Sequence, residues 1–185
     1  MAKHGRGLIC LALTQEKVKK LKLPLMSLIN KSRTQTAFTV SIEAKKGIST
    51  GISAYDRAKT IKVAIKNSSG SRDIVSPGHV FPLVSKNGGV LERAGHTEAS
   101  VDISKLAKLN PSAVICEVMN EDGTMARYND LVPFSKKHNL KIAKIEDLIS
   151  YRLKNEKFIK MISNRKINIK RFGNYDLKVF KNKLD

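Results

Sequence analysis

The feature that most constrains the fold is the length of the apolar runs, all of which are short. The longest candidates, residues 8–13 and 112–116, have the length of a buried strand. Neither approaches the ~18 apolar residues that a membrane-spanning helix needs. Between such runs lie segments with helical spacing, such as residues 96–109. Strands interleaved with helices predict an α+β domain with a mixed sheet flanked by helices, and a chain of 185 residues is long enough to bury one core.

The expected elements follow from periodicity and from helix-capping residues. Thr14 and Ser53 each stand where a side-chain oxygen would cap the first turn of a helix. Alternation of apolar and polar residues at 36–43 indicates a strand with one solvent face, which argues against a purely parallel sheet. Proline and glycine interrupt residues 76–85, which are not expected to be helical. Further strands are expected at 7–13, 112–118 and 141–145, and helices at 14–21, 53–64, 96–109, 132–139 and 145–157.

Two cysteines and the N-terminal sequence indicate the cellular compartment. Cys10 and Cys116 both lie in apolar, strand-like segments and are not spaced as CxxC. They are therefore expected to be buried free thiols in a reducing cytoplasm, not a disulfide framework or a zinc site. Residues 5–7, Gly-Arg-Gly, interrupt the N-terminus before an apolar stretch develops, so no signal peptide is expected and no membrane partner.

The net charge of +19 raises the question of nucleic-acid binding. Lysine dominates this charge, with 26 lysines against nine arginines, and the chain has no tryptophan. Base readout favours arginine, and single-strand binding favours aromatic platforms. We therefore interpret the charge as a compositional shift toward lysine, asparagine and isoleucine, and expect no nucleic-acid partner. A basic nucleic-acid-binding protein stays the less favoured alternative.

Four residue positions stand out as candidates for chemistry. His79 and His96 each follow a glycine in a non-helical setting, and Arg93 lies between them in the sequence. Because His96 also stands where a helix should begin, free N–H groups would favour an anion there. Glu117 follows an apolar strand; it is either buried with a raised pKa, which suits a proton shuttle, or it faces solvent beside a sheet edge. Both histidines could equally be loop residues that backbone groups satisfy.

Seven blocks of the sequence, in order, strongly resemble the 3,4-dihydroxy-2-butanone 4-phosphate synthase family. The blocks run from residue 4 to residue 152. Because seven blocks occur in the same order as in the family, agreement by chance is negligible. The blocks are HGRGLICLAL (4–13), TAFTVSIEA (36–44), TGISAYDRAKTI (50–61), SPGHVFPL (76–83), GGVLERAGHTEASVDISKLA (88–107), ICEVMNEDGTMAR (115–127) and IEDLISYR (145–152).

The resemblance implies a lyase of riboflavin biosynthesis, which converts D-ribulose 5-phosphate to L-3,4-dihydroxy-2-butanone 4-phosphate and formate. It also implies Mg²⁺ or Mn²⁺ as cofactor, a cytoplasmic homodimer, and sites near the subunit interface. His79 and Glu117 would be the catalytic residues, and His96 would ligate the metal. The substrate would contact Arg93, Ala94, Gly95, His96, Thr97 and Glu117, with Asp56 and Thr50 as weaker candidates.

Two departures from the family pattern concern the ends of the chain. The family has an acidic segment resembling DDEDRENEGD before the first block, which supplies a metal-binding glutamate; Met1 here precedes the first block directly. We therefore expect an N-terminally truncated domain at 1–152, with an inactive relic as the alternative. The basic tail at 153–185 is either an unstructured extension or a vestige of the junction into a GTP cyclohydrolase II domain, which INIKRFGNYDLKV (167–179) faintly resembles.

Overall fold

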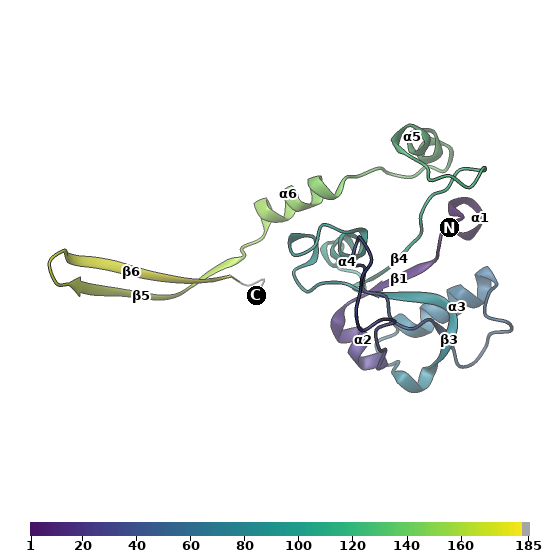
Figure 1. The fold of residues 1–185 in the computed structure, drawn as a ribbon, viewed down its shortest axis with the longest axis horizontal. Coiled ribbons are helices and arrows are strands. Elements are labelled where there is room, and N and C mark those ends of the chain that lie inside the picture. Colours follow the sequence, from purple (N-terminus) through teal and green to yellow (C-terminus); the bar gives the residue numbers. More distant parts are fainter. Residues whose placement is uncertain (183–185) are drawn as a thin grey trace.

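The computed structural model describes residues 1–182. It consists of a main body, a helical arm (residues 128–155) and a projecting hairpin (residues 159–182) (Figure 1). The strands and helices alternate along most of the chain, as the sequence predicts. In chain order the elements are α1 (Ala2–Gly5), β1 (Cys10–Leu13), α2 (Gln15–Leu21), β2 (Ile42–Ala44), α3 (Ala54–Ile65), the 3₁₀ turn η1 (Ser71–Asp73), β3 (Ile74–Val84), the 3₁₀ turn η2 (Gly89–Leu91), α4 (His96–Leu106), β4 (Ser112–Ile115), α5 (Tyr128–Lys137), α6 (Ile145–Asn155), β5 (Ile159–Ile169) and β6 (Gly173–Asn182).

A four-stranded mixed sheet in the order β2-β3-β1-β4 forms the centre of the body. Strand β1 runs parallel to β3 and antiparallel to β4, so Cys10 aligns with Phe81 on one side and with Ile115 on the other. The edge strand β2 pairs antiparallel with β3 through a register shift between Ile42 and Glu43. The mixed α+β class is therefore confirmed, because both strand directions occur in one sheet.

The core forms where helices α2, α3 and α4 pack against this sheet, and Val18 and Leu21 of α2 belong to its main apolar cluster. Helix α3 contacts β2 and β3, whereas α4 contacts β1 and β4. Apolar side chains from several elements become fully buried between these layers, each contributing about 1.5–3 kcal/mol by its removal from water. The members with almost no exposed surface include Leu11, Leu13, Leu21, Ile42 and Val80.

Both predicted N-caps are confirmed. The side-chain oxygen of Thr14 accepts a hydrogen bond from Lys17 N at 3.2 Å, and that of Ser53 accepts one from Asp56 N at 3.0 Å. Each cap satisfies one of the amide groups that a helix leaves free in its first turn. The starts of α2 and α3 are thus local properties of the sequence.

The continuous strand predicted at 36–43 is wrong for most of its length. Phe38 and Thr39 make only isolated bridges, and regular pairing begins at Ile42. Thr39 N donates to Pro82 O on β3, whereas Val40 N donates to Pro24 O on another segment. Because neither proline has an N–H to return a bond, a regular ladder cannot continue through this stretch.

Two further expectations need correction. Residues 141–145 form no strand: α6 begins at Ile145, and the half-exposed Ile142 has no strand beside it within residues 1–182. Residues 112–118 form a strand only as far as Ile115, at the half-buried edge of the sheet. Cys116 is accordingly only partly buried, in contrast to Cys10, which is fully buried as predicted.

The tail forms an antiparallel hairpin of β5 and β6 that projects away from the body (Figure 1). Its ladder runs from the Ile159–Asn182 pair to the Ile169–Gly173 pair, and nearly every residue in it is exposed. Residues 159–182 are therefore structured, although the boundary proposed at residue 152 stays a prediction. Within residues 1–182, no helix has the length and apolar character that crossing a bilayer requires.

Candidate active site

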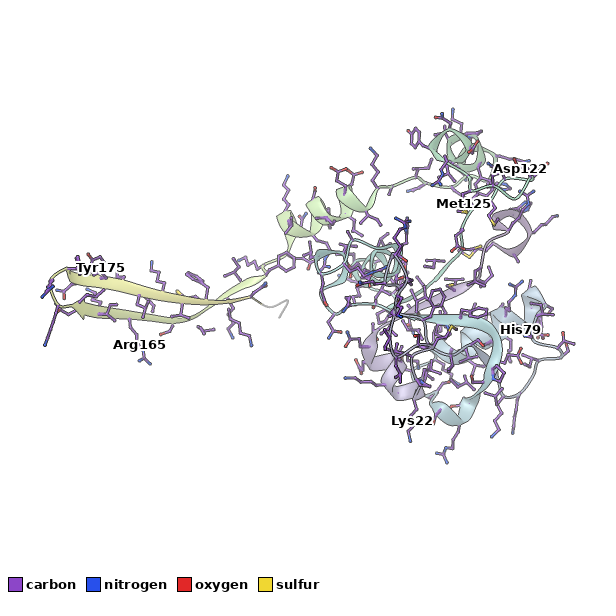
Figure 2. All side chains as sticks on the ribbon, viewed as in Figure 1. Lys22, His79, Asp122, Met125, Arg165 and Tyr175 are labelled. Carbon is purple, nitrogen blue, oxygen red and sulfur yellow. The ribbon has the colours of Figure 1, made fainter. Side chains whose placement is uncertain are left out.

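His79 lies on β3 in the main body, where Figure 2 labels it. Its ring nitrogen Nδ1 contacts the Oε1 atom of Glu43 on β2, which pairs with β3. The imidazole is about half-exposed (44%), whereas the Glu43 side chain is mostly buried (16%). The predicted catalytic histidine is therefore accessible to solvent. Its Nδ1 atom contacts the carboxylate of Glu43, a residue that the sequence did not indicate as a candidate.

Asp56 organises the loop next to this pair. Its buried carboxylate accepts hydrogen bonds from the Ser49 hydroxyl (2.8 Å) and from Gly51 N (3.1 Å). The hydrogen bond from the Ser49 side chain, followed by smaller contributions that include Gly51 N, lowers the pKa of Asp56, against the opposing effect of burial. Thr50 lies exposed between these two donors. Asp56 thus supports the loop that carries Thr50 through hydrogen bonds from Ser49 and Gly51.

Glu117 lies just beyond the end of β4 and is exposed. Of the two predicted settings for this residue, the solvent-facing one is correct. Its Oε2 accepts a hydrogen bond from Leu8 N at 2.9 Å, and a Cβ on Gly7 would lie only 2.6 Å from the same oxygen. Glycine at position 7 therefore allows the backbone to approach this carboxylate closely.

The strand register brings His79 and Glu117 to the same end of the sheet. Leu8 and His79 each stand two residues before the paired residues Cys10 and Phe81. Since Leu8 N binds Glu117, the carboxylate and the imidazole lie on either side of the N-terminal end of β1. Because β1 lies between β3 and β4, the two side chains lie at the same end of the sheet about two strand spacings, or roughly 10 Å, apart.

A second group of candidates surrounds the start of α4. His96 is the first residue of this helix and is exposed, and Gly95 is its N-cap. Thr97 is buried, whereas Ala94 is exposed. The segment from Ala94 to Thr97 therefore places an exposed imidazole at a helix start, where the positive end of the helix dipole favours an anion.

Arg93 is held by contacts that the sequence did not predict. Its guanidinium donates to Glu98 Oε2 at 2.5 Å, to Thr34 O at 2.8 Å and to Thr36 Oγ1 at 3.0 Å. Glu98 has the spacing of an ordinary first-turn acid, but it is almost fully buried (1%). A buried carboxylate needs a partner, so the burial of Glu98 would have predicted an ion pair with a nearby arginine. The sequence does not show that Glu98 is buried, and the pair could not be predicted from it.

The candidate residues thus form two groups. Within residues 1–182, no hydrogen bond or ion pair joins the 93–97 segment to His79 or Glu117. An open surface pocket of about 460 Å³ has none of these candidates in its lining, which consists of Lys20, Lys22, Ser68, Gly70, Ser71, Arg72 and Asp73. The candidate residues therefore lie in two separate groups, in which His79, His96 and Glu117 are exposed.

A divalent metal does not fit the residues described. Mg²⁺ prefers several oxygen ligands in octahedral geometry. In the described part of the chain, no three residues of the types His, Cys, Asp or Glu lie close enough together to hold an ion. His96 alone is a single nitrogen ligand, and the neighbouring Glu98 carboxylate is engaged by Arg93 and by Lys86 N. These residues do not by themselves complete a magnesium site.

Cys10 lies at the same end of the sheet as Glu117 and is not a nucleophile at neutral pH. Burial, followed by the nearby charge of Glu117, raises the pKa of its thiol to about 12. Burial also raises the pKa of Cys116. A raised thiol pKa disfavours a thiolate at this end of the sheet, so His79 and Glu117 stay the candidates for acid–base chemistry there.

Comparison with known proteins identifies the family. The model of the family described as 3,4-dihydroxy-2-butanone 4-phosphate synthase matches residues 1–151. This chain belongs to that family. A synthase of this name from Photobacterium phosphoreum is 50% identical over 185 residues, which cover all of this chain and 51% of the relative. The riboflavin biosynthesis protein RibBA of Aquifex aeolicus is 58% identical over 166 residues, covering 89% of this chain and 41% of that protein.

Solved structures of synthases in this family have the same fold. A two-domain synthase from A. baumannii, RibBX, matches with a TM-score of 0.88 and 47% identity, over 98% of this chain and 53% of its own. A synthase solved in complex with two magnesium ions matches with a TM-score of 0.79 and 38% identity, over 84% of this chain and 77% of its own. The chain spans about half the length of the curated relatives described above. The mixed sheet and its helices are therefore those of the synthase family.

Proposed function

We propose that the protein acts in riboflavin biosynthesis as the lyase that converts D-ribulose 5-phosphate to L-3,4-dihydroxy-2-butanone 4-phosphate and formate. The observation that carries this proposal is the match of the family model to residues 1–151. Residues 4–152 contain every candidate side chain named from the sequence, and the exposed ones lie at one end of the sheet, in the loop before α3 and at the start of α4.

His79 and Glu117 are the proposed acid–base residues. The reaction requires protons to be removed from and returned to carbons next to a carbonyl, and a positioned imidazole and carboxylate can do both. Support comes from their exposure to solvent and from the register that assigns both to the N-terminal end of β1. Both side chains are exposed, so a sugar phosphate could contact them without a change in the surrounding fold.

The substrate is proposed to bind at residues 93–97, with Asp56 and Thr50 contributing at the edge. A helix start with free amides suits a phosphate or an oxyanion. Arg93 would act in this site from a fixed position, since Glu98, Thr34 and Thr36 hold its guanidinium. Asp56 would act through the loop that it supports, because its carboxylate already accepts from Ser49 and Gly51.

We propose Mg²⁺ or Mn²⁺ as cofactor, with His96 as the ligand that this chain contributes. The related structure with two magnesium ions supports a divalent cation. Since the described residues do not complete the ligand set, carboxylates from other residues are needed, and the acidic segment that the family carries before its first block is the proposed source. A cytoplasmic homodimer is proposed as well; sedimentation at micromolar concentration measures its mass directly.

Formate release from D-ribulose 5-phosphate with Mg²⁺ tests the proposal. The assay compares the chain alone, the chain extended by an acidic segment resembling DDEDRENEGD, and the extended chain with His96→Ala. Release by the extended chain that is lost in His96→Ala supports both the reaction and the ligand. A folded extended chain that releases no formate contradicts the proposed function and favours an inactive relic of the family.

A further inference from the structure

The Glu43 carboxylate depends on His79 for its hydrogen bonding. Its side chain is mostly buried, and among residues 1–182 its hydrogen-bond partner is the Nδ1 atom of His79. Burying an unpaired carboxylate is costly, so the contact accounts for the burial of Glu43. The opposite ring nitrogen, Nε2, makes no hydrogen bond within the described residues, and the half-exposed ring leaves it open to solvent.

The local backbone is built around this carboxylate. The register of β2 against β3 shifts between Ile42 and Glu43, and a bulge of this kind redirects a side chain. A Cβ on Gly51 would lie 1.7 Å from Glu43 Oε1, and one on Gly78 would lie 2.5 Å from Glu43 Cγ. The two glycines, from different segments, therefore leave the room that the Glu43 side chain occupies.

A carboxylate at Nδ1 determines which ring nitrogen carries the proton of a neutral imidazole. Because a carboxylate only accepts, Nδ1 must be the donor, and the lone pair is then on Nε2. A histidine fixed in this tautomer can take a proton from a substrate carbon at Nε2 and return it there. Without the carboxylate, the ring can adopt either tautomer and can rotate.

We propose that Glu43 is a positioning residue that holds His79 in its Nδ1–H tautomer, with Nε2 directed to the substrate side. This inference rests on the proposed function for its catalytic meaning, but the tautomer itself is a property of the chain. Glu43 touches neither the substrate nor a metal in this role, and it acts through His79.

The first test is the tautomer of His79, measured by long-range ¹H–¹⁵N NMR of the imidazole above neutral pH. The wild-type chain should show a proton on Nδ1, and Glu43→Gln should show a mixture of tautomers, because its amide can also donate to Nδ1. Glu16→Gln, an exposed acid on α2, is the matched control and should match the wild type. The same tautomer in wild type and Glu43→Gln would overturn the proposal.

The second test is a double-mutant cycle in the form of the protein that releases formate. Glu43→Gln should lower kcat by about 10- to 100-fold and leave KM within about 3-fold, and Glu43→Asp should restore part of kcat. In a His79→Gln background, Glu43→Gln should have no further effect, since both act as one unit. Independent, multiplying effects would overturn the positioning role. If no form releases formate, the proposed function fails while the NMR result still decides the tautomer.

Discussion

Gly51 and Gly123 have the same φ angle, +84°, in different surroundings. An added Cβ at Gly51 would overlap the Glu43 carboxylate, whereas at Gly123 no atom lies within 4 Å. At the residue scale, alanine substitutions at these two positions therefore distinguish the cost of backbone strain from the cost of steric overlap. The strain of an alanine at positive φ is common to both positions and costs about 1–2 kcal/mol.

We expect Gly51→Ala to lower the free energy of unfolding by at least about 1–3 kcal/mol more than Gly123→Ala does, because overlap adds to strain. Urea unfolding of both variants at one pH measures the difference. Equal losses would mean that the Glu43 side chain moves aside without cost.

The Asp56 carboxylate gives stability a defined pH dependence. Its pKa is lowered below the ordinary value of 3.8, chiefly by the Ser49 hydroxyl. A group whose folded pKa is lowered stabilises the fold above its unfolded pKa, and this contribution is lost as pH falls through the folded pKa. Asp56→Asn should therefore destabilise the protein at neutral pH, with a gap from the wild type that narrows below about pH 4. Urea unfolding between pH 3 and 7 measures this gap; a constant gap would contradict the assignment.

At the scale of elements, Arg152 connects helix α6 to the main body through hydrogen bonds and an ion pair. Arg152 Nη1 donates to Asp102 Oδ2 at 2.7 Å and to Gly88 O at 2.9 Å, and both Arg152 and Asp102 are buried. Asp102 in turn accepts from Val90 N, which ties α4 to η2. The network joins three elements through one buried ion pair.

Arg152→Met should cost about 3–5 kcal/mol of unfolding free energy, because it leaves Asp102 buried without its cation. The double variant Arg152→Met/Asp102→Asn should regain part of that loss, because the neutral amide removes the buried charge and its oxygen can still accept from Val90 N. Lys154→Ala, on the exposed surface of the same helix, should change stability by less than about 0.5 kcal/mol. Equal effects of Arg152→Met and Lys154→Ala in thermal or urea unfolding would exclude the ion pair as the fastening of α6.

At the scale of the whole molecule, the hairpin and the body are distinct in packing. Figure 2 shows the side chains of Arg165 and Tyr175 on the hairpin, far from His79 in the body. Apolar side chains such as Phe172 (71% exposed) and Phe180 (55%) are open to solvent. A two-stranded hairpin with so little burial is only marginally stable in water.

Removing residues 159–185 should therefore shift the thermal midpoint of the body by less than about 2 °C. This truncation keeps Glu156, which accepts from Arg152, and Phe158, which lies under its guanidinium. Hydrogen exchange on the full chain should show rapid exchange in β5 and β6 and slow exchange in β1 and β3. A large drop in the midpoint on truncation would show that the hairpin stabilises the body.

The sequence by itself determined the features that depend on near neighbours. Thr14 and Ser53 cap the predicted helices, and α4 begins at His96, because capping and 3.6-residue periodicity act within a few residues. The family blocks likewise indicated the mixed α+β fold. The candidate roles of His79 and Glu117 came from the same resemblance, and they stay predictions.

Only the tertiary structure decided which distant groups meet. Glu43 and His79 are 36 residues apart, and Asp102 and Arg152 are 50 apart, so no local pattern specifies either pair. The strand predicted at 36–43 is interrupted because Pro82, a residue on the neighbouring strand, cannot donate a hydrogen bond to it. Strand pairing and burial depend on what another part of the chain places alongside, and that information lies in the packing and not in the periodicity.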